Sequence, residues 1–358
     1  MNLMRELRSR GTLPIAVAPE DEYAERIRAE GIRFVAMAMD NQGTSPSRDL
    51  ALVWRLYRLF QAERPSAVLT YTPKPNIYAS LAAMPLRIPV INNVAGLGSA
   101  FTRGGWVAGV ADVLYRCALP ASRRVFFQND DDLALFRRRW LVRTSRSERL
   151  PGSGVDLQRF QPRTVTRNDG AFVVLFVGRI LADKGVRELV DAVRRLQGHH
   201  PRIELRLLGP LNVENPTAIQ AAEIEAWEKA GVVRHLGFTD DVASHIAEAD
   251  CVVHPSYYRE GVPRSLLEAA ALGKPIITAD TIGCRDAVDD GITGFLCRPR
   301  DAADLAEKME RMIALTPRER EAMGRGGRTK MEREFDEQIV INRYLEVLES
   351  IGSPRRTT

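Results

Sequence analysis

The chain has 358 residues, of which 45% are hydrophobic, and it carries a formal net charge of +5 at pH 7. This length suits two cores of ordinary size better than one. No stretch approaches the ~18 consecutive apolar residues that a membrane span needs, and residues 1–10 show an amphipathic helix pattern without the apolar segment of a signal peptide. None of the four cysteines has Cys-x-x-Cys spacing, which is typical of reduced structural thiols. We therefore expect a cytosolic protein of two domains.

Positive charge is concentrated between residues 116 and 149, where nine arginines accompany four acidic residues. Such a patch could bind an anionic membrane surface, which contributes ~1 kcal/mol per basic residue close to it. The pattern is equally typical of a solvated arginine-rich face. Both interpretations stay open on sequence alone, and nucleic acid is not an expected partner.

Short apolar runs that predict strands alternate with helical patterns from end to end. In the first half these runs cover residues 13–18, 34–37, 67–71, 89–92 and 125–128, and in the second half residues 172–177, 204–208, 232–236, 251–254 and 275–278. Alternation of this kind predicts an α/β fold whose parallel sheets are covered by helices on both faces. Charged helices follow over residues 301–350, and Gly324, Gly326 and Gly327 between them are typical of a hinge.

Glycine, proline and polar residues dominate the segment 151–170, which marks a linker between the two sets of strands. The predicted architecture is two Rossmann-like domains, over residues 1–155 and 156–335, whose parallel sheets face each other across a cleft. Residues 336–358 are predicted to form a helix that crosses back toward the N-terminal domain, followed by a tail. In such a fold a first strand and a Gly-rich turn precede the opening helix, whereas this chain begins in what looks like that helix. The first strand is therefore expected to be absent, through a late start codon or a truncation.

Residues 258–268 carry two carboxylates, Glu260 and Glu268, directly after the strand predicted over residues 251–254. Glu260 is expected in the loop at the carboxyl end of that strand, where open α/β sheets bind ligands. Pro263 suits the first turn of a helix, so Glu268 is expected inside the helix that follows.

Backbone N–H groups at this helix start, those of Gly261, Val262 and Arg264, are predicted to be free and to form a seat for an anion. Carboxylates can accept hydrogen bonds from sugar hydroxyls, and the seat between them suits phosphate. The combination indicates a nucleotide-sugar site.

The segment 178–185 follows the strand predicted over residues 172–177 and opens a helix. Arg179 and Lys184 lie in this loop, so both can point toward one ligand. Two cations beside a helix N-terminus suit a diphosphate, and fixed cations stabilise the charge that builds on a leaving phosphate oxygen. The alternative is a helix-capping loop with two surface ion pairs, which the nearby carboxylates make less favourable.

Two other patterns are interpreted as structural. Asp130, Asp131 and Asp132 imitate a metal-binding acid cluster, but they follow a strand and open a helix, which favours N-capping. No histidine has metal-ligand spacing with another histidine or with a cysteine, and His254 on an apolar strand is expected to be a satisfied core residue. We therefore expect no metal site.

The second half resembles the donor domain of retaining family 4 glycosyltransferases, which have the GT-B fold. The motifs that carry the resemblance are Val177-Gly-Arg with Lys184-Gly, Arg259-Glu-Gly-Val-Pro-Arg-Ser-Leu-Leu-Glu-Ala, Gly273-Lys-Pro-Ile-Ile, and Gly291-Ile-Thr-Gly-Phe. In the first half, segments 71–76, 92–98, 127–129 and 150–155 resemble the subgroup that builds capsules, O-antigens and lipid-linked glycans. That subgroup includes bacterial N-acetylgalactosaminyltransferases acting on undecaprenyl-diphosphate-linked sugars. The resemblance covers essentially the whole chain.

The resemblance implies a retaining hexosyltransferase that moves an N-acetylhexosamine or hexose from a nucleotide sugar, UDP-linked, to a saccharide on polyprenyl diphosphate. It implies a peripheral protein on the anionic inner face of a bacterial plasma membrane, and neither a metal nor another cofactor. Front-face attack, in which a donor phosphate oxygen takes the acceptor proton, is also implied, so no protein nucleophile is expected.

By position, the resemblance assigns the donor diphosphate to Arg179 and Lys184. It assigns the ribose hydroxyls to Glu268 and the transferred sugar, near its reacting carbon, to Glu260. The donor cradle is completed by Gly178 and by the backbone of Gly261, Val262 and Arg264.

On the acceptor side the resemblance points to Lys74, Asn93, Gly96 and Gly98. Many relatives carry a catalytic histidine in the first domain, where this chain offers Thr70, Thr72 or Lys74. The apolar segment 106–119, which begins with Trp106, is predicted as either a buried helix or an interfacial helix that touches the bilayer.

Two other functions stay open. A UDP-sugar epimerase of similar two-domain fold would need acid/base side chains near the sugar, for which Glu260 is almost the only candidate. A truncated, non-catalytic relative that binds sugar nucleotides would agree with the absent first strand.

Overall fold

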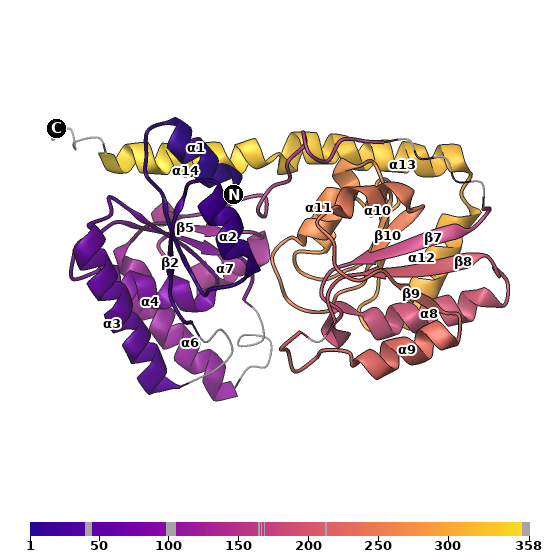
Figure 1. The fold of residues 1–358 in the computed structure, drawn as a ribbon, viewed down its shortest axis with the longest axis horizontal. Coiled ribbons are helices and arrows are strands. Elements are labelled where there is room, and N and C mark those ends of the chain that lie inside the picture. Colours follow the sequence, from indigo (N-terminus) through magenta and orange to yellow (C-terminus); the bar gives the residue numbers. More distant parts are fainter. Residues whose placement is uncertain are drawn as a thin grey trace.

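The computed structural model describes every residue except 40–44, 98–104, 164, 166, 168, 212 and 353–358. Figure 1 shows two α/β domains side by side, with the last helices lying along one side of both. The predicted α/β class and the two-domain architecture are therefore confirmed.

The N-terminal domain alternates strands with helices. Its strands are β1 (Ile15–Ala18), β2 (Arg33–Ala36), β3 (Val68–Tyr71), β4 (Val90–Val94), β5 (Ser122–Phe127) and β6 (Ser147–Arg149). Its helices are α1 (Asn2–Ser9), α2 (Glu22–Ala29), α3 (Pro46–Glu63), α4 (Pro73–Ala83), α6 (Gly105–Ala118) and α7 (Asp130–Arg138), with short 3-10 turns η1 (Leu119–Ala121) and η2 (Thr144–Arg146).

The strands of this domain form two separate parallel ladders. β1 pairs with β2, and a four-stranded sheet follows the order β3-β4-β5-β6. Within the described residues no strand pairs with β1 on its other side, or with β3 on the side away from β4. In the doubly wound order a first strand would lie between these two edges. Within the described residues the strands of this domain are thus interrupted between β1 and β3.

The second domain contains a longer alternation. Its strands are β7 (Phe172–Val177), β8 (Ile203–Leu208), β9 (Val233–His235), β10 (Cys251–His254), β11 (Ile276–Ala279) and β12 (Gly294–Cys297). Its helices are α8 (Val186–Gln197), α9 (Ala221–Lys229), α10 (Val242–Glu248), α11 (Arg264–Ala271), α12 (Ala302–Ala314) and α13 (Pro317–Lys330), with 3-10 turns η3 (Ala182–Lys184) and η4 (Arg285–Ala287). The π-helical turn η5 (Met331–Phe335) and helix α14 (Glu337–Gly352) end the described chain.

All six strands of the second domain are parallel, in the order β12-β11-β10-β7-β8-β9. The chain adds β8 and β9 on one side of β7 and then returns to add β10, β11 and β12 on the other. The direction of winding therefore reverses between β7 and β10, which is the position where doubly wound sheets bind ligands.

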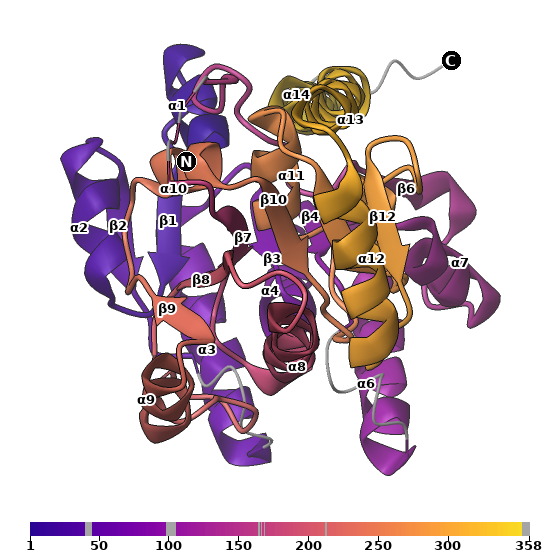
Figure 2. The same cartoon turned by 90° about the vertical axis from the view of Figure 1, so that its right-hand side faces the viewer.

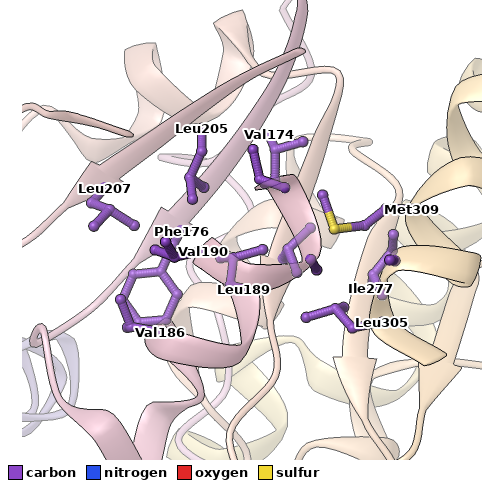
Figure 3. Packing of buried hydrophobic residues seen from close by; sticks show 14 of the residues in the cluster. Val174, Phe176, Val186, Leu189, Val190, Leu205, Leu207, Ile277, Leu305 and Met309 are labelled. Atoms are coloured by element: carbon purple, nitrogen blue, oxygen red, sulfur yellow. The ribbon is translucent and has the colours of Figure 1, made fainter. Parts of the chain in front are cut away.

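The residues of β7 are apolar without interruption because both faces of this strand are buried in the core of the second domain. Val174 and Phe176 face one layer of helices, where they pack with Leu189 and Met309 (Figure 3). Leu175 faces the opposite layer, formed around α11 and η5. A parallel strand covered on both faces has no polar side, and each fully buried side chain of this size contributes about 1.5–3 kcal/mol.

Helix α14 returns to the N-terminal domain. Tyr344 is buried there, its ring centroid 4.9 Å from that of Phe126 in an edge-to-face contact. The Nδ2 of Asn93 donates to the Tyr344 hydroxyl oxygen at 2.9 Å. Where α14 begins, a Cβ on Gly154 would lie 2.4 Å from the Cα of Glu337, so the close crossing requires glycine. Figure 2 shows α13 and α14 together at the edge of both domains.

All ten predicted strands are present, with ends within three residues of the predicted ones. Two short strands, β6 and β12, are absent from the prediction. β6 is a polar Ser-Glu-Arg triplet and β12 begins at a glycine, so neither carries the β-branched apolar pattern that identifies a strand.

The glycines expected at a hinge instead lie inside α13. A Cβ on Gly324 would lie 1.8 Å from the carbonyl oxygen of Gly273, and one on Gly327 would contact Ala270. The prediction of a hinge is therefore wrong. These glycines allow α13 to lie directly against the end of α11.

Candidate active site

The candidate site lies at the carboxyl ends of β7 and β10. The two strands are hydrogen-bonded neighbours, so the loops that follow them, residues 178–185 and 255–263, meet at one edge of the sheet. Gly185 has φ +76°, and a Cβ there would lie 2.2 Å from the carbonyl oxygen of Pro255. Only glycine permits this approach, which brings the end of η3 against the loop after β10.

Lys184 and Glu260 form an ion pair at this junction. The Nζ of Lys184 donates to Oε1 of Glu260 at 2.6 Å and also bonds Oε2, and the two side chains are 11% and 18% exposed. The hydroxyl of Ser256 donates to Oε1 at 3.0 Å. Burial is the largest single effect and would raise the pKa of the Glu260 carboxyl, but Lys184 and His254 together outweigh it and lower this pKa to about 2. Glu260 is therefore an anion across the physiological pH range.

His254, which ends β10, lies beside this pair. Its ring is stacked on Phe176, and its Nε2 lies 3.6 Å from Oε1 of Glu260. Neither ring nitrogen has a hydrogen-bond partner among the described residues, and burial lowers the pKa of the imidazole. The prediction that His254 is buried in the core is confirmed, whereas the prediction that its polar atoms are satisfied is wrong. The sequence does not indicate that His254 lies beside Glu260, because the two side chains meet only through the folding of the loop after β10.

Cys284 completes a cluster that sequence spacing does not predict. One ligand-type atom from each of His254, Glu260 and Cys284 lies within 4.8 Å of the others. A metal ion here would compete with Lys184 for Glu260, and burial raises the pKa of the Cys284 thiol to about 12, far from the thiolate that binds metals. The donor set fits a metal poorly, and metal independence stays a prediction.

The other predicted donor-side residues lie at the same edge but do not join this pair. Arg179 is exposed and forms no ion pair with the described residues. Glu268 lies on α11 with its side chain 14% exposed, 3.5 Å from Nη2 of Arg264, and burial raises its pKa. Gly178 has φ +148°, which suits the sharp turn after β7. Of the four charged residues expected to converge, the structure brings Lys184 and Glu260 into contact.

The loop that carries Glu260 also touches the N-terminal domain. The N–H of Gly261 donates to the carbonyl oxygen of Ala95 at 3.1 Å. A Cβ on Gly261 would lie 2.0 Å from Oε1 of Gln128, and one on Gly96 would lie 2.6 Å from the Gly261 nitrogen. The expectation that the Gly261 N–H is free for an anion is therefore wrong in this conformation, because an oxygen of the other domain occupies it.

Several predicted acceptor-side residues have structural partners. Lys74 Nζ donates to Asp49 at 2.9 Å, and Asp49 also accepts from the Tyr78 hydroxyl at 2.7 Å. Thr70 is buried and donates to Asn76 at 2.7 Å. Thr72 is exposed just after β3 at φ +67°, a strained conformation for a β-branched residue.

Asn93 is buried and bonds Tyr344, and Gly96 meets the loop of Glu260. Gly98 lies outside the described residues, as does the side chain of Trp106.

Comparison with known proteins identifies the family. The model "Glycosyl transferases group 1" matches residues 158–330, and "Glycosyl transferase 4-like domain" matches residues 1–152, so the two together span nearly the whole chain. The chain belongs to this glycosyltransferase family. The models describe glycosyltransferases, so the alternative of a UDP-sugar epimerase is not supported.

Relatives of similar length agree. An N,N'-diacetylbacillosaminyl-diphospho-undecaprenol alpha-1,3-N-acetylgalactosaminyltransferase of Campylobacter jejuni is 25% identical over 98% of this chain and 94% of its own length. The capsular polysaccharide biosynthesis glycosyltransferase CapM of Staphylococcus aureus is 27% identical over 82% of this chain and 78% of its own. Among solved structures, Anabaena Alr3699/HepE in complex with UDP-glucose superimposes with a TM-score of 0.80 at 20% identity, covering 98% of this chain and 94% of that one. The GT-B fold is thus confirmed.

Gly96→Ala should push the two domains apart. The new Cβ would overlap the Glu260–Gly261 backbone, and φ +103° disfavours any side chain. We expect a lower Tm and a larger radius of gyration in small-angle scattering. Gly109→Ala is the matched control: Gly109 lies in α6 with open space around it, so alanine should leave the dimensions unchanged and raise stability by about 0.5–1 kcal/mol. Unchanged dimensions and Tm in Gly96→Ala would contradict the domain contact.

His254 should make stability fall as the pH drops below about 6.5, the ordinary pKa of histidine. Its pKa is lowered in the folded state, so between the two pKa values only the unfolded chain binds the proton. Stability is then lost by up to about 1.4 kcal/mol per pH unit. The Glu260 pKa of about 2 lies below its ordinary value of 4.5, so its contribution is lost only in more acidic solution. Tm should decrease less between pH 7.5 and 5.5 in His254→Gln than in the wild type; identical decreases would refute this assignment.

Proposed function

We propose that this glycosyltransferase moves a hexose or N-acetylhexosamine from a UDP-linked sugar to a saccharide carried on polyprenyl diphosphate, with retention of anomeric configuration. The observation that carries the proposal is the Lys184–Glu260 ion pair at the point where the sheet reverses its winding. A cation and a fixed anion there can hold the diphosphate and the sugar of one ligand.

The charge states favour this division of roles. Glu260 stays ionised, so it can accept hydrogen bonds from sugar hydroxyls but has no proton to donate near neutral pH. Lys184 provides an ammonium beside it, and Arg179 at the other end of the same loop is exposed and available for phosphate. As the bond from the anomeric carbon to the phosphate oxygen breaks, both cations would stabilise the charge that remains on UDP.

Retention follows from front-face attack. The acceptor hydroxyl forms its bond on the face from which UDP leaves, and its proton passes to a phosphate oxygen of the departing UDP. This route needs no protein base, which agrees with a site whose central carboxylate is already held by Lys184. Thr72, exposed at the carboxyl end of β3, is the N-cap residue of α4 but makes no side-chain capping bond, which supports an acceptor-side role for its hydroxyl.

The Campylobacter jejuni relative is named for an acceptor on diphospho-undecaprenol, and the Anabaena structure holds UDP-glucose; both support the proposed substrates. A cavity of about 670 Å³ beside α3 supports an acceptor with apolar and anionic parts, because its wall is largely apolar with two arginines. It is lined by Pro19, Ala38, Met39, Arg48, Asp49, Ala51, Leu52 and Arg55. All of these lining residues belong to the N-terminal domain.

We also propose that the protein binds the anionic cytoplasmic face of the plasma membrane. No helix among the described residues is long and apolar enough to cross a bilayer. Val113 on α6 is 61% exposed, and Leu50 and Trp54 on α3 are 71% and 58% exposed. Figures 1 and 2 both place the ends of α3 and α6 at one extremity of the N-terminal domain. Apolar side chains beside arginines on such helices suit the headgroup region of a bilayer.

The arginine-rich segment contributes less free charge than its sequence indicates. Arg139 pairs with Asp112 at 2.8 Å and Arg149 with Asp130 at 3.1 Å. Arg146 donates to the carbonyl oxygen of Pro120 at 2.7 Å. The apolar residues of α3 and α6 therefore carry more of the membrane proposal than this segment does.

Lys184→Ala and Glu260→Ala should each lower turnover by about 10²–10³, the scale for loss of one electrostatic stabiliser. The assay offers a panel of nucleotide sugars with a polyprenyl-diphosphate-linked saccharide and follows UDP release and the anomeric form of the product. Lys229→Ala and Glu225→Ala, both exposed on α9, are matched controls with expected wild-type rates. Chelator should leave activity intact. Near-normal rates in both site variants would defeat the assignment of these roles.

Trp54→Ala and Trp106→Ala should each weaken co-sedimentation with vesicles that contain phosphatidylglycerol. Phe238→Ala is the control, because Phe238 is 51% exposed on the second domain and belongs to neither α3 nor α6. Binding should be weaker to neutral phosphatidylcholine vesicles and at high salt. If all three variants co-sediment like the wild type, these helices do not dock on the membrane.

A further inference from the structure

A buried ion pair joins the two domains next to Glu260. Arg259, in the loop after β10, donates from Nε and Nη2 to Oδ1 of Asp132 at 2.9 and 2.5 Å. Asp132 lies in the first turn of α7 and is fully buried, whereas the Arg259 side chain is 25% exposed. The pair therefore links the donor-side loop to the N-terminal domain in a largely water-excluded place.

The helix cap does not account for the Asp132 side chain. Asn129 is the N-cap of α7, and its Oδ1 accepts from the Asp132 N–H at 2.7 Å. The Nδ2 of Asn129 donates to Oδ2 of Asp132 at 3.0 Å, which leaves Oδ1 directed at Arg259. The carboxylate is thus held by its own domain through one oxygen and presented to the other domain through the second. N-capping, the role expected from sequence for Asp130, Asp131 and Asp132, belongs to Asn129.

Arg259 and Glu260 are consecutive, and their side chains are held by different domains. Glu260 bonds Lys184 and Ser256 inside the second domain, while Arg259 bonds Asp132 in the first. The backbone of Glu260 and Gly261 packs directly against Gly96 of the N-terminal domain. These two contacts hold neighbouring side chains to opposite domains, so the backbone between them cannot rotate as it could if only one side chain were held.

We propose that Asp132 and Arg259 are positioning residues that fix the Glu260 loop against the N-terminal domain. This rests on the role proposed above for Glu260. Neither residue needs to touch the substrates: the pair acts through the backbone that carries Glu260. A displacement of ~1 Å at a reacting group can lower a rate by about 100-fold, so such an anchor matters for turnover.

A neighbouring pair provides an internal comparison. Asp131, one residue earlier on α7, accepts from Arg285 at 2.9 Å, but its side chain is 46% exposed and that of Arg285 38%. Exposed pairs of this kind contribute little. For Asp132, burial raises the pKa of the carboxyl and Arg259 opposes that shift. Loss of the arginine would therefore leave a buried carboxylate without its counter-charge, which lowers the free energy of unfolding. The two adjacent aspartates should therefore differ sharply in effect.

Hydrogen exchange tests the anchor without any assay of transfer. In Asp132→Asn and Arg259→Gln, the backbone amides of residues 257–262 should exchange at least about 10-fold faster than in the wild type, including the Gly261 N–H that bonds Ala95. Asp131→Asn should leave these amides unchanged, and Arg259→Lys should restore part of the protection. Wild-type exchange in Asp132→Asn would overturn the proposal, whatever the activity of the enzyme.

Kinetics then test the consequence for the reaction. Asp132→Asn should lower kcat by about 10- to 100-fold while the Kd for UDP stays within about twofold, because the pair does not contact the nucleotide. The double variant with Arg259→Gln should lose no more than the worse single variant, since both remove one interaction. Faster exchange with an unchanged kcat, or multiplied losses in the double variant, would overturn the positioning role. If the wild type itself transfers no sugar, the proposed function fails while the exchange result still decides whether the anchor exists.

Discussion

The ion pair between Lys184 and Glu260 fixes the geometry on which the rest of the site depends. Either charge buried alone would cost several kcal/mol, so each of the loops after β7 and β10 supplies the partner that the charge on the other requires. The N–H of Tyr257 also donates to the Asp183 carbonyl oxygen, which joins the same two loops. The loops meet because the strand order makes β7 and β10 neighbours in the sheet. In the chain, 73 residues that include β8 and β9 lie between Val177, the end of β7, and Cys251, the start of β10. Gly185 then removes the last steric obstacle, because any side chain there would overlap Pro255. Topology, one glycine and two opposite charges together place an anion at the edge where the sheet reverses its winding.

The loop that carries Glu260 forms part of the domain contact and, in the proposed function, part of the donor site. Gly261 offers its N–H at a helix start, where an anion seat is expected, yet here it donates to Ala95 of the other domain. One N–H cannot form a full-strength bond to a phosphate oxygen and to the Ala95 carbonyl at the same time. Donor binding through this N–H would therefore have to loosen the contact with Ala95, while the Arg259–Asp132 pair keeps the loop attached. The junction thus has one contact made through a backbone N–H, Gly261 to Ala95, and one made between side chains, Arg259 to Asp132.

Sequence patterns predict the parts of the structure that depend on local order. Ten strands, the loop positions of Lys184 and Glu260 and the helix after Pro263 all follow from apolar runs and turn residues. Contacts between distant segments are not predictable in this way. His254 and Cys284 approach Glu260 from separate loops, and Asp132 meets Arg259 across the domain junction, so spacing gives no sign of either contact. Gly324 shows the converse error: glycine favours a hinge when only neighbours along the chain are considered, whereas here it makes room for a packed backbone.

Helix α14 connects these features mechanically. Tyr344 is buried in the N-terminal domain and bonds Asn93, whose Oδ1 lies 3.4 Å from Nε2 of Gln128. Gln128 in turn lies against Gly261, the residue after Glu260. A chain of buried polar contacts therefore runs from the helix that joins the domains to the loop that carries the central carboxylate. Because buried hydrogen bonds are costly to leave unmade, a shift of α14 relative to β4 would be resisted at each of these contacts. The relative position of the two domains and the orientation of Glu260 are for this reason parts of one constraint.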